Sequence, residues 1–340
     1  EESFCEMSGG TIRENSAVRG SAVMLYSLST DKKANFTLSE SALITENICV
    51  KPNRSIDASG AVAVEGNSAF HMTGGSIEKN TGEKGVGVCV LDHGLLTGSG
   101  EFETSFVMDG GRISENQGLT GGGIYSYSNE VYLNRGVISS NTANMGGGVY
   151  CEGNRTSYST LHLKNAVVTQ NHSEDQGGGL WLCSTGDAKV YVTNGGAVYG
   201  NTADGAGDDV VSVEAYDGMD SSITLSDRIL GGGRVYWYQD GGIYRISPSL
   251  IYASTDTNAA RYGEEISEPL EIKGLQTNLA LKAIADPSVT ALAGSRAKLL
   301  ITGNTAVSYG GGIGSNGGVV IGEDTAELID IPVKKIWEHG

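Results

Sequence analysis

Short runs in which apolar and polar residues alternate fill most of the chain, and turn residues separate them. Residues 149–151 (VYC), 161–163 (LHL) and 190–192 (VYV) are examples. Alternation with a period of two is typical of β-strands that bury one face. No segment keeps apolar residues at helical spacing between caps, so repeats built from helices are not expected. The pattern therefore predicts an all-β chain of many short strands.

The clearest unit of the pattern is residues 108–127, MDGGRISENQGLTGGGIYSY. It contains Ile-x-x-Asn (Ile113, Asn116) and then a glycine triplet followed by a β-branched residue, and both signatures recur. The recurring asparagines, here the asparagine column, are Asn15, Asn47, Asn80, Asn116, Asn141, Asn171, Asn201 and Asn304. An aliphatic residue lies three positions before each of them: Ile12, Ile44, Ile77, Ile113, Ile138, Val168, Val198 and Ile301.

Successive asparagines are 25 to 36 residues apart up to Asn201, and Asn304 follows 103 residues later. Periods of this length indicate a solenoid whose units bury their apolar faces against each other. Two or three short strands in each unit describe a coil of parallel strands. We therefore expect a parallel β-helix, and a right-handed one, because crossovers between parallel strands almost always have that hand.

The asparagines are expected to have a structural role. Charged residues such as Glu14, Glu46 and Lys79 precede them and cannot face the core, so the chain must turn there. Asparagine tolerates the left-handed conformation of such turns. Stacked from coil to coil, the side-chain amides can also hydrogen-bond to each other as a ladder. The alternative is a turn residue without a ladder.

The repeats assign residues 1–212 and 297–325 to the β-helix, with polar excursions at residues 31–36 and 92–106. Residues 213–296 lack the asparagine column and carry a tyrosine-rich run. We expect them to be a divergent, strand-rich insertion, although about three degenerate coils would also fit. Residues 326–340 are expected to be a linker and the first strand of a following domain.

Composition adds limits on partners. Glycine is 51 of 340 residues, about twice the usual share of ~7%, as many tight turns require. The net charge of −17 makes nucleic acid and anionic membrane surfaces poor partners. No apolar run is long enough for a membrane span and no signal peptide is recognisable. The chain begins inside a repeat, so we expect a piece of a longer multidomain protein.

The cysteines show no paired spacing of the kind that zinc sites use. They are Cys5, Cys49, Cys89, Cys151 and Cys183. We expect buried free thiols rather than disulfides or a zinc site.

Two resemblances follow from these motifs. The repeated Gly-Gly-Gly-Ile and Ile-x-x-Asn resembles the Gly-Gly-Ala-Ile and Phe-x-x-Asn repeats of chlamydial polymorphic membrane proteins, and the wider class of right-handed β-helix repeats in bacterial surface proteins. It covers about two thirds of the chain. Residues 333–338 (VKKIWE) resemble the first strand of collagen-adhesin B-type domains in Gram-positive surface stalks. Together the resemblances imply an exposed module of a wall-anchored, extracellular protein with a function in adhesion.

One column of side chains is the candidate binding surface. The second residue after each glycine group is aromatic at Tyr125, Tyr150 and Trp181, and the residue before it is the natural inward one. Strand alternation then directs the three rings outward, where they suit sugar rings or a protein partner. Tyr236, Trp237 and Tyr238 could form an opposite wall. Equally, residues 213–296 could cover the rings as plain packing.

Catalysis and calcium are the competing interpretations of the acidic residues. Parallel β-helices resemble pectate lyases and polygalacturonases, whose chemistry uses grouped carboxylates with a basic partner. The candidates for such a centre are Asp204, Asp208 and Asp209, with Asp187, Lys189 and Arg135 as companions. The same aspartates with Glu214, Asp217 and Asp220 could bind Ca²⁺. Asp208 and Asp209 stand where other coils carry glycine, and no recognisable lyase motif accompanies them.

The sequence therefore predicts a non-catalytic cell-surface adhesin that binds a host or community ligand, either a glycan or a matrix protein. No cofactor is expected beyond a possible Ca²⁺. The alternatives are a polysaccharide lyase or glycoside hydrolase, and a passive surface stalk without any binding surface.

Overall fold

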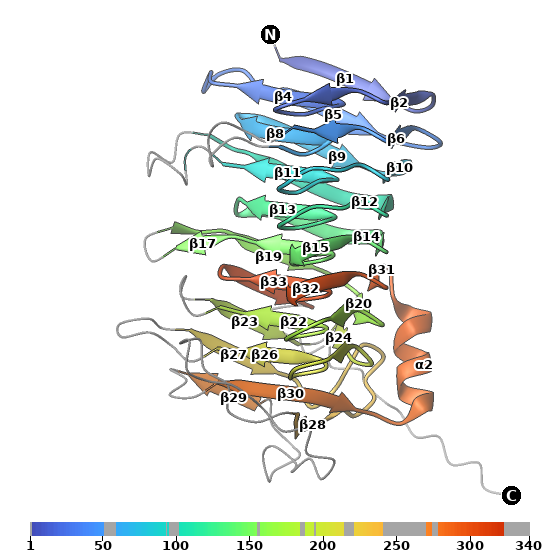
Figure 1. Cartoon of the computed structure of the whole chain (residues 1–340), viewed down its shortest axis with the longest axis vertical. Coiled ribbons are helices and arrows are strands. Elements are labelled where there is room, and N and C mark those ends of the chain that lie inside the picture. Colours follow the sequence, from blue (N-terminus) through green and yellow to red (C-terminus); the bar gives the residue numbers. More distant parts are fainter. Residues whose placement is uncertain are drawn as a thin grey trace, which may run out of the picture.

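The computed structural model describes residues 2–50, 59–92, 94, 102–154, 157–183, 188–193, 195–213, 221–240, 270–273 and 278–322. Within these ranges the chain is mostly β-structure, with one short helix, α2 (Pro287–Arg296). The strands lie in stacked layers and form long, mainly parallel sheets (Figure 1). The all-β class expected from the alternating pattern is confirmed. Across these ranges, no helix combines the length and the apolar character that a membrane span needs.

The long sheet contains two ladders that share β12 and β14. The first runs in the order β1 (Ser3–Met7), β5 (Ala34–Leu38), β9 (Ser68–Met72), β12 (Ser105–Ser114), β14 (Glu130–Ser139), β19 (Thr160–Leu163), β34 (Gly318–Ile321), β23 (Lys189–Val192), β27 (Ser222–Leu225) and β29 (Leu270–Lys273). The second runs β2 (Thr11–Arg13), β6 (Leu43–Thr45), β10 (Ser76–Glu78), β12, β14, β31 (Leu299–Thr302), β20 (Ala166–Thr169) and β24 (Gly196–Val198).

A second sheet of ten strands follows the glycine triplets. Its order is β4 (Val23–Ser27), β8 (Val62–Gly66), β11 (Val88–Leu91), β13 (Ile124–Tyr127), β16 (Val149–Cys151), β33 (Ile313–Ser315), β22 (Leu180–Leu182), β26 (Val210–Ser212), β30 (Leu279–Ile284) and β28 (Tyr236–Gln239). Short strands complete the layers: β3 (Ser16–Ala17) with β7 (Ile48–Cys49); β15 (Thr142–Met145), β32 (Thr305–Tyr309), β21 (His172–Ser173) and β25 (Thr202–Ala203); and the hairpin β17 (Gly153–Asn154) with β18 (Ser157–Tyr158). All pairings are parallel except the hairpin and those of β28, β29 and β30.

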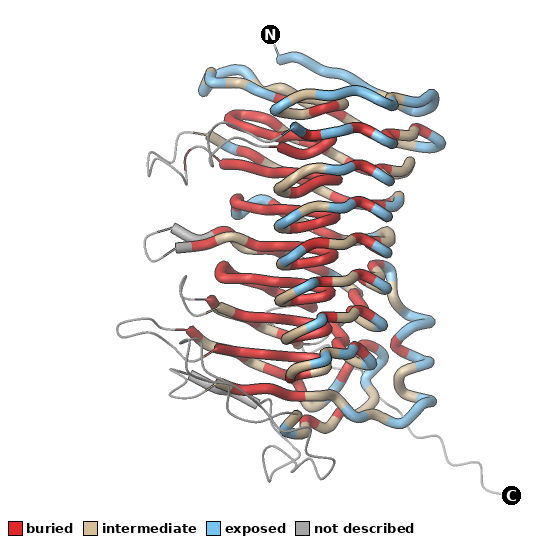
Figure 2. Tube along the Cα trace, in the orientation of Figure 1, coloured by how far each residue is buried: buried red, intermediate tan, exposed pale blue. Residues whose placement is uncertain are grey.

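The core is one continuous apolar cluster that runs the length of the stack between the sheets (Figure 2). The aliphatic column lies inside it: Ile44, Ile77, Ile113, Ile138, Val168, Val198 and Ile301 are fully buried. The first layer is more open, since Ile12 and Met7 are only half-buried. The apolar residues of successive layers therefore pack into one core.

The asparagine column is a continuous row of hydrogen bonds. In each step one side-chain Nδ2 donates to the Oδ1 of the asparagine in the next layer, at 2.8–3.0 Å. The backbone N–H of the same asparagine donates to that oxygen as well. The order along the row is Asn15, Asn47, Asn80, Asn116, Asn141, Asn304, Asn171 and Asn201. All but Asn15 are buried.

The left-handed residue of the turn is the one before the asparagine, not the asparagine itself. Positive φ angles of 56–65° occur at Glu14, Glu46, Lys79, Glu115, Ser140, Gln170, Gly200 and Gly303. The expectation that asparagine supplies this conformation is corrected. The preceding side chain can point to solvent from the left-handed turn, which leaves the asparagine free to point inward and join the row.

The third glycine of each triplet is required by the neighbouring amide. A Cβ at Gly123 would lie 3.0 Å from Asn141 Nδ2, and one at Gly179 would lie 2.7 Å from Asn201 Nδ2. Gly87, Gly148 and Gly312 face asparagines in the same way. The glycine triplet and the asparagine column therefore depend on each other, because the third glycine of one layer leaves room for the asparagine amide of the next.

The last repeat does not lie at the end of the stack. Strands β31 to β34, from residues 299–321, occupy a place between layers that residues 130–163 and 166–192 form (Figure 1). The repeat itself was expected, but its position could not be read from its place in the sequence. Of residues 213–296, the described parts continue the parallel ladder at β27 and then cover the end of the stack with antiparallel β28, β29 and β30.

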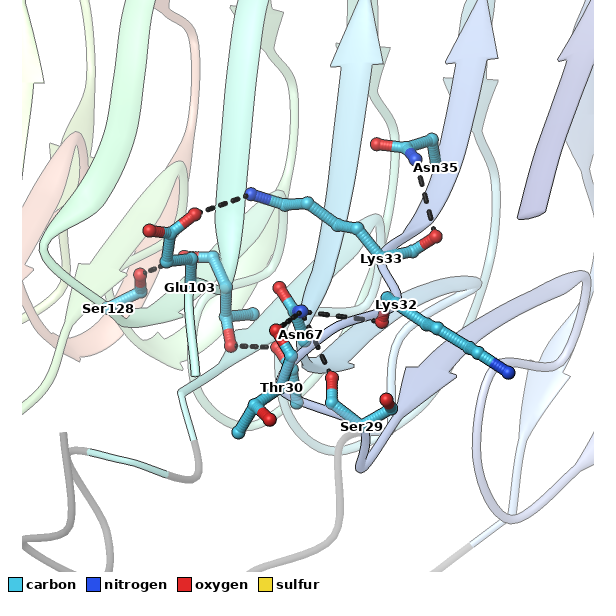
Figure 3. A network of polar contacts seen from close by, with 10 residues as sticks. Ser29, Thr30, Lys32, Lys33, Asn35, Asn67, Glu103 and Ser128 are labelled. Carbon is cyan, nitrogen blue, oxygen red and sulfur yellow. Dashed lines mark hydrogen bonds and ion pairs between the residues drawn. The ribbon is translucent and has the colours of Figure 1, made fainter. Parts of the chain in front are cut away.

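Loops connect strands of the second sheet to the strands of the long sheet that follow them in the sequence. The expected polar excursion at residues 31–36 ends at residue 33, because β5 begins at Ala34. Asn67 holds this loop, since its Nδ2 donates to the carbonyl oxygens of Ser29, Thr30 and Lys32 (Figure 3). Part of the second excursion, and residues 326–340 with their expected stalk strand, lie outside the described residues.

All five cysteines are free, as predicted. Cys49, Cys89 and Cys151 are buried, Cys183 is half-buried and Cys5 is exposed. Burial raises the pKa of the Cys89 and Cys151 thiols to about 12, so both are poor nucleophiles and serve as small apolar side chains.

We expect Asn141→Ala to lower the free energy of unfolding by about 1–3 kcal/mol, because it leaves buried hydrogen-bond groups without partners. The Asn141 side chain accepts from Asn116 and donates to Ile113 O and Asn304 Oδ1. Urea unfolding measures the loss. Asn144→Ala is the matched control, since Asn144 is exposed in the same repeat outside the row. Equal stability of the two variants would show that the row contributes nothing.

Candidate functional site

Tyr125 and Tyr150, two of the three rings predicted to face outward, are buried. They belong to an apolar cluster separate from the main core, with their rings stacked at 6.1 Å between centroids. Met145 packs on this cluster and the Lys84 ammonium lies over the Tyr125 ring. The Tyr125 hydroxyl donates to Glu152 Oε2 at 2.9 Å. Burial, with the nearby Glu152 charge, raises the pKa of both phenols.

Trp181 is covered in the same way. Its ring stacks on Tyr309 at 4.5 Å, and its Nε1 donates to Gln176 Oε1 at 3.3 Å. Ala206 and Ala280 complete its surroundings. The prediction of an open aromatic column at Tyr125, Tyr150 and Trp181 is thus corrected. Alternation does turn the rings away from the main core, but residues just before the glycine triplets fold back over them.

The tyrosine-rich strand does not stand opposite these rings. Tyr236, Trp237 and Tyr238 lie in β28, the last strand of the second sheet, beyond β30 and β26. Trp237 is buried in the main core and donates from Nε1 to Ser226 O at 3.1 Å. Tyr236 and Tyr238 are half-buried on the other face of the strand. These residues cover the end of the stack rather than forming a wall of a groove.

Asp209 ends the row of asparagines. Its Oδ1 accepts from Asn201 N and Nδ2, at 3.0 and 2.8 Å, as an asparagine of a further layer would. Its Oδ2 accepts from Ala283 N at 2.7 Å, which joins the antiparallel strand β30 to the stack. Asp209 stands where other layers have the third glycine, and no further amide occupies the space that its side chain fills. Burial raises the pKa of Asp209 to about 6.

The other candidates for a lyase centre have separate partners. Asp208 accepts from Ala203 N, while its own N–H donates to Asp240 Oδ2. Asp204 is exposed beside His172. Lys189 lies in β23 and Arg135 in β14, and Asp187 lies outside the described residues. The three aspartates therefore have different hydrogen-bond and ion-pair partners.

No group of three or more His, Cys, Asp or Glu side chains that could hold a metal ion occurs in the part of the chain that the structure describes. Glu214, Asp217 and Asp220, named with the aspartates as calcium ligands, lie outside that part. Binding of Ca²⁺ therefore stays a prediction.

The outer face of the long sheet carries a row of side chains that the alternating pattern alone did not single out; all are half-exposed except Val320, which is buried. In register across the layers lie Thr37, His71, Val107, Tyr132, His162, Val320, Tyr191 and Thr224. Their neighbours along each strand, such as Leu161 and Leu163 beside His162, are buried in the core. Tyr132 and His162 stack at 4.9 Å between ring centroids. We call this row the outer row.

Polar groups lie beside the outer row at the level of β9, β12 and β14. His71 Nε2 is 2.8 Å from Asp109 Oδ2, and Asn134 Nδ2 donates to Asp109 Oδ1 at 3.0 Å. The hydrogen bond from His71 lowers the pKa of Asp109. The side chains of His71 and Asp109 are 45% and 44% exposed, so a ligand can reach both. Imidazole, carboxylate, amide and phenol thus lie together on one rigid face.

One signal in the sequence could have revealed the outer row. In β9, β14 and β19 the exposed residue stands between two buried apolar ones, as in 70–72 (FHM), 131–133 (VYL) and 161–163 (LHL). Alignment on the middle residue places His71, Tyr132 and His162 in one column.

No protein-family model, no curated protein and no solved structure matches the chain.

The pKa of Asp209, about 6 against an ordinary 3.8, gives a testable pH dependence. The folded chain binds this proton more tightly than the unfolded chain, so Asp209 makes the fold more stable as the pH falls through about 6. Relative to Asp209→Asn, we expect the wild-type free energy of unfolding to rise by about 1–3 kcal/mol between roughly pH 7.5 and pH 4.5. Urea unfolding of both proteins at both pH values measures this. If the free energies of unfolding of the two proteins change by the same amount between the two pH values, Asp209 does not titrate as a buried group.

Proposed function

We propose that the chain is a right-handed parallel β-helix and serves as a non-catalytic binding module of a bacterial cell-surface protein. Parallel pairing from layer to layer supports the coil, and the general hand of crossovers between parallel strands supports its right-handed sense. The surface location rests on the resemblance of the repeats, and of residues 333–338, to surface proteins. The ligand that we propose is a neutral glycan, bound along the outer row.

The main support for a glycan site is the position of Tyr132 and His162 beside three polar residues on the outer face of the long sheet. These residues are His71, Asp109 and Asn134. Phenol, imidazole, carboxylate and amide together offer donors and acceptors that match hydroxyl groups. Adjacent layers lie about 4.8 Å apart, so the side chains of the row follow each other at that interval. A polyhydroxylated chain that lies along the row can therefore meet several of these groups at once.

Rigidity and charge favour this ligand class. Tyr132 is held on its ring face by His162, so its binding costs little side-chain entropy. The net charge of −17 opposes long-range attraction of polyanions. Neutral sugars escape this repulsion, whereas uronans and sulfated glycans do not.

A screen of the whole chain against neutral and acidic glycans tests the ligand class, with extracellular matrix proteins as the second set. We expect binding to neutral glycans. Binding only to matrix proteins would replace the glycan, and binding to neither set would favour a passive spacer.

Tyr132→Ala and His71→Ala should each weaken binding of the captured glycan by about tenfold or more, or about 1.4 kcal/mol. The reason is that each removes a group held at the centre of the polar face. Calorimetry or surface plasmon resonance measures Kd. Asn144→Ala, on a different face, should leave Kd unchanged. If glycan binding survives both substitutions at full affinity, the outer row is not the site.

A further inference from the structure

Residues 298–322, here the inserted coil, fill one turn of the stack from a distant part of the chain. β31 pairs with β14 on one side and β20 on the other, while β33 pairs with β16 and β22. In the row of amides, Asn304 joins Asn141 to Asn171. Without the inserted coil, both neighbouring layers would end in unpaired strand edges.

Between β19 and β20 the chain skips one layer of the stack, which leaves a space for the inserted coil. β19 pairs with β14, yet β20, three residues further on, pairs with β31 and not with β14. The step is at Asn165, whose φ is +47°. Both ends of the inserted coil are held here: Lys298 N and Leu299 N donate to Asn165 O, and Gly322 N donates to Leu163 O at 2.8 Å.

The space is closely matched to its occupant. Leu299, Ile301, Ile313 and Ile321 are fully buried in the core. A Cβ at Gly312 would lie 3.0 Å from Asn171 Nδ2, so the glycine is needed here as elsewhere. At the surface, Ser308 Oγ donates to Asn144 Oδ1 at 2.9 Å. Backbone pairing, amides and apolar side chains all specify this one segment.

The connection to the rest of the chain is much less specific. Helix α2 runs along the side of the stack between β30 and β31 (Figure 1). Only Ala293 of its ten residues is buried, and Leu292 is 40% exposed. The Tyr199 hydroxyl donates to Thr290 O at 3.0 Å. Little energy therefore ties the inserted coil to its own chain, compared with what ties it to the space.

We propose that the space between β14–β19 and β20–β23 accepts the inserted coil of a second copy of this chain, which produces coil-exchanged dimers. Every contact of the coil is the same whether it comes from the same chain or from a second copy. Only the connection and the cost of association differ, so the protein concentration decides between the forms. Contacts across 130 or more residues also form late, which leaves time for an exchange.

Two chains, each with one accessible cysteine beside the buried Cys49, Cys89 and Cys151, test the exchange. Both carry Cys5→Ser and Cys183→Ser, which remove the accessible thiols; one adds Asn144→Cys and the other Ser308→Cys. They are unfolded, mixed, refolded at several concentrations and oxidised. We expect a disulfide-linked dimer of the two chains, increasing with concentration and well above the level in either chain alone.

The double variant Asn144→Cys with Ser308→Cys is the control and should link within one chain at low concentration. If it links there while the mixture yields no more dimer than the separate chains, the exchange does not occur. If it fails to link, the inserted coil does not lie beside Asn144 and the proposal falls. Size-exclusion chromatography of the wild-type chain, refolded at rising concentration, measures dimer formation without introduced cysteines. A monomer at every concentration would also overturn the proposal.

Discussion

The hydrogen-bonded row of asparagine amides is the interaction on which the rest of the structure depends. Every amide after Asn15 is buried, so its donors and acceptors must be paired within the protein. Pairing with the equivalent amide of the next layer is possible only if the layers keep one spacing and one register. The row thereby requires a left-handed residue before each asparagine and a glycine opposite it. These are the features that recur in every regular repeat.

The ends of this row explain two residues that otherwise look unrelated. Asn15 begins the row in an open layer and is exposed. At the other end, Asp209 takes the place of a glycine, because its own carboxylate occupies the position of a further amide. A residue that could have been interpreted as a catalytic acid is therefore part of the stacking device. Its second oxygen also joins the covering strand β30 to the stack.

The register that most strands of the long sheet keep has a consequence for binding. It aligns residues on the outer face of the long sheet. His71, Tyr132 and His162 therefore lie in one row, although at least 30 residues of sequence separate each of them from the next. It also makes the layers interchangeable as neighbours. A coil from far along the sequence fits between two others because each presents the same edges, the same amide and the same glycine.

The fold class and the repeating unit were determined by the sequence alone, because they depend on local features. Alternation predicts the strands, and the asparagine and glycine signatures follow from backbone conformation and the need to pair a buried amide. The tertiary structure decided the rest. The inserted position of residues 298–322 depends on a step at Asn165 that has no marker in the repeat pattern. The burial of Tyr125, Tyr150 and Trp181 depends on neighbouring turns that fold over them. Strand alternation tells which side of a strand a residue occupies, but only packing between distant segments decides whether that side meets solvent.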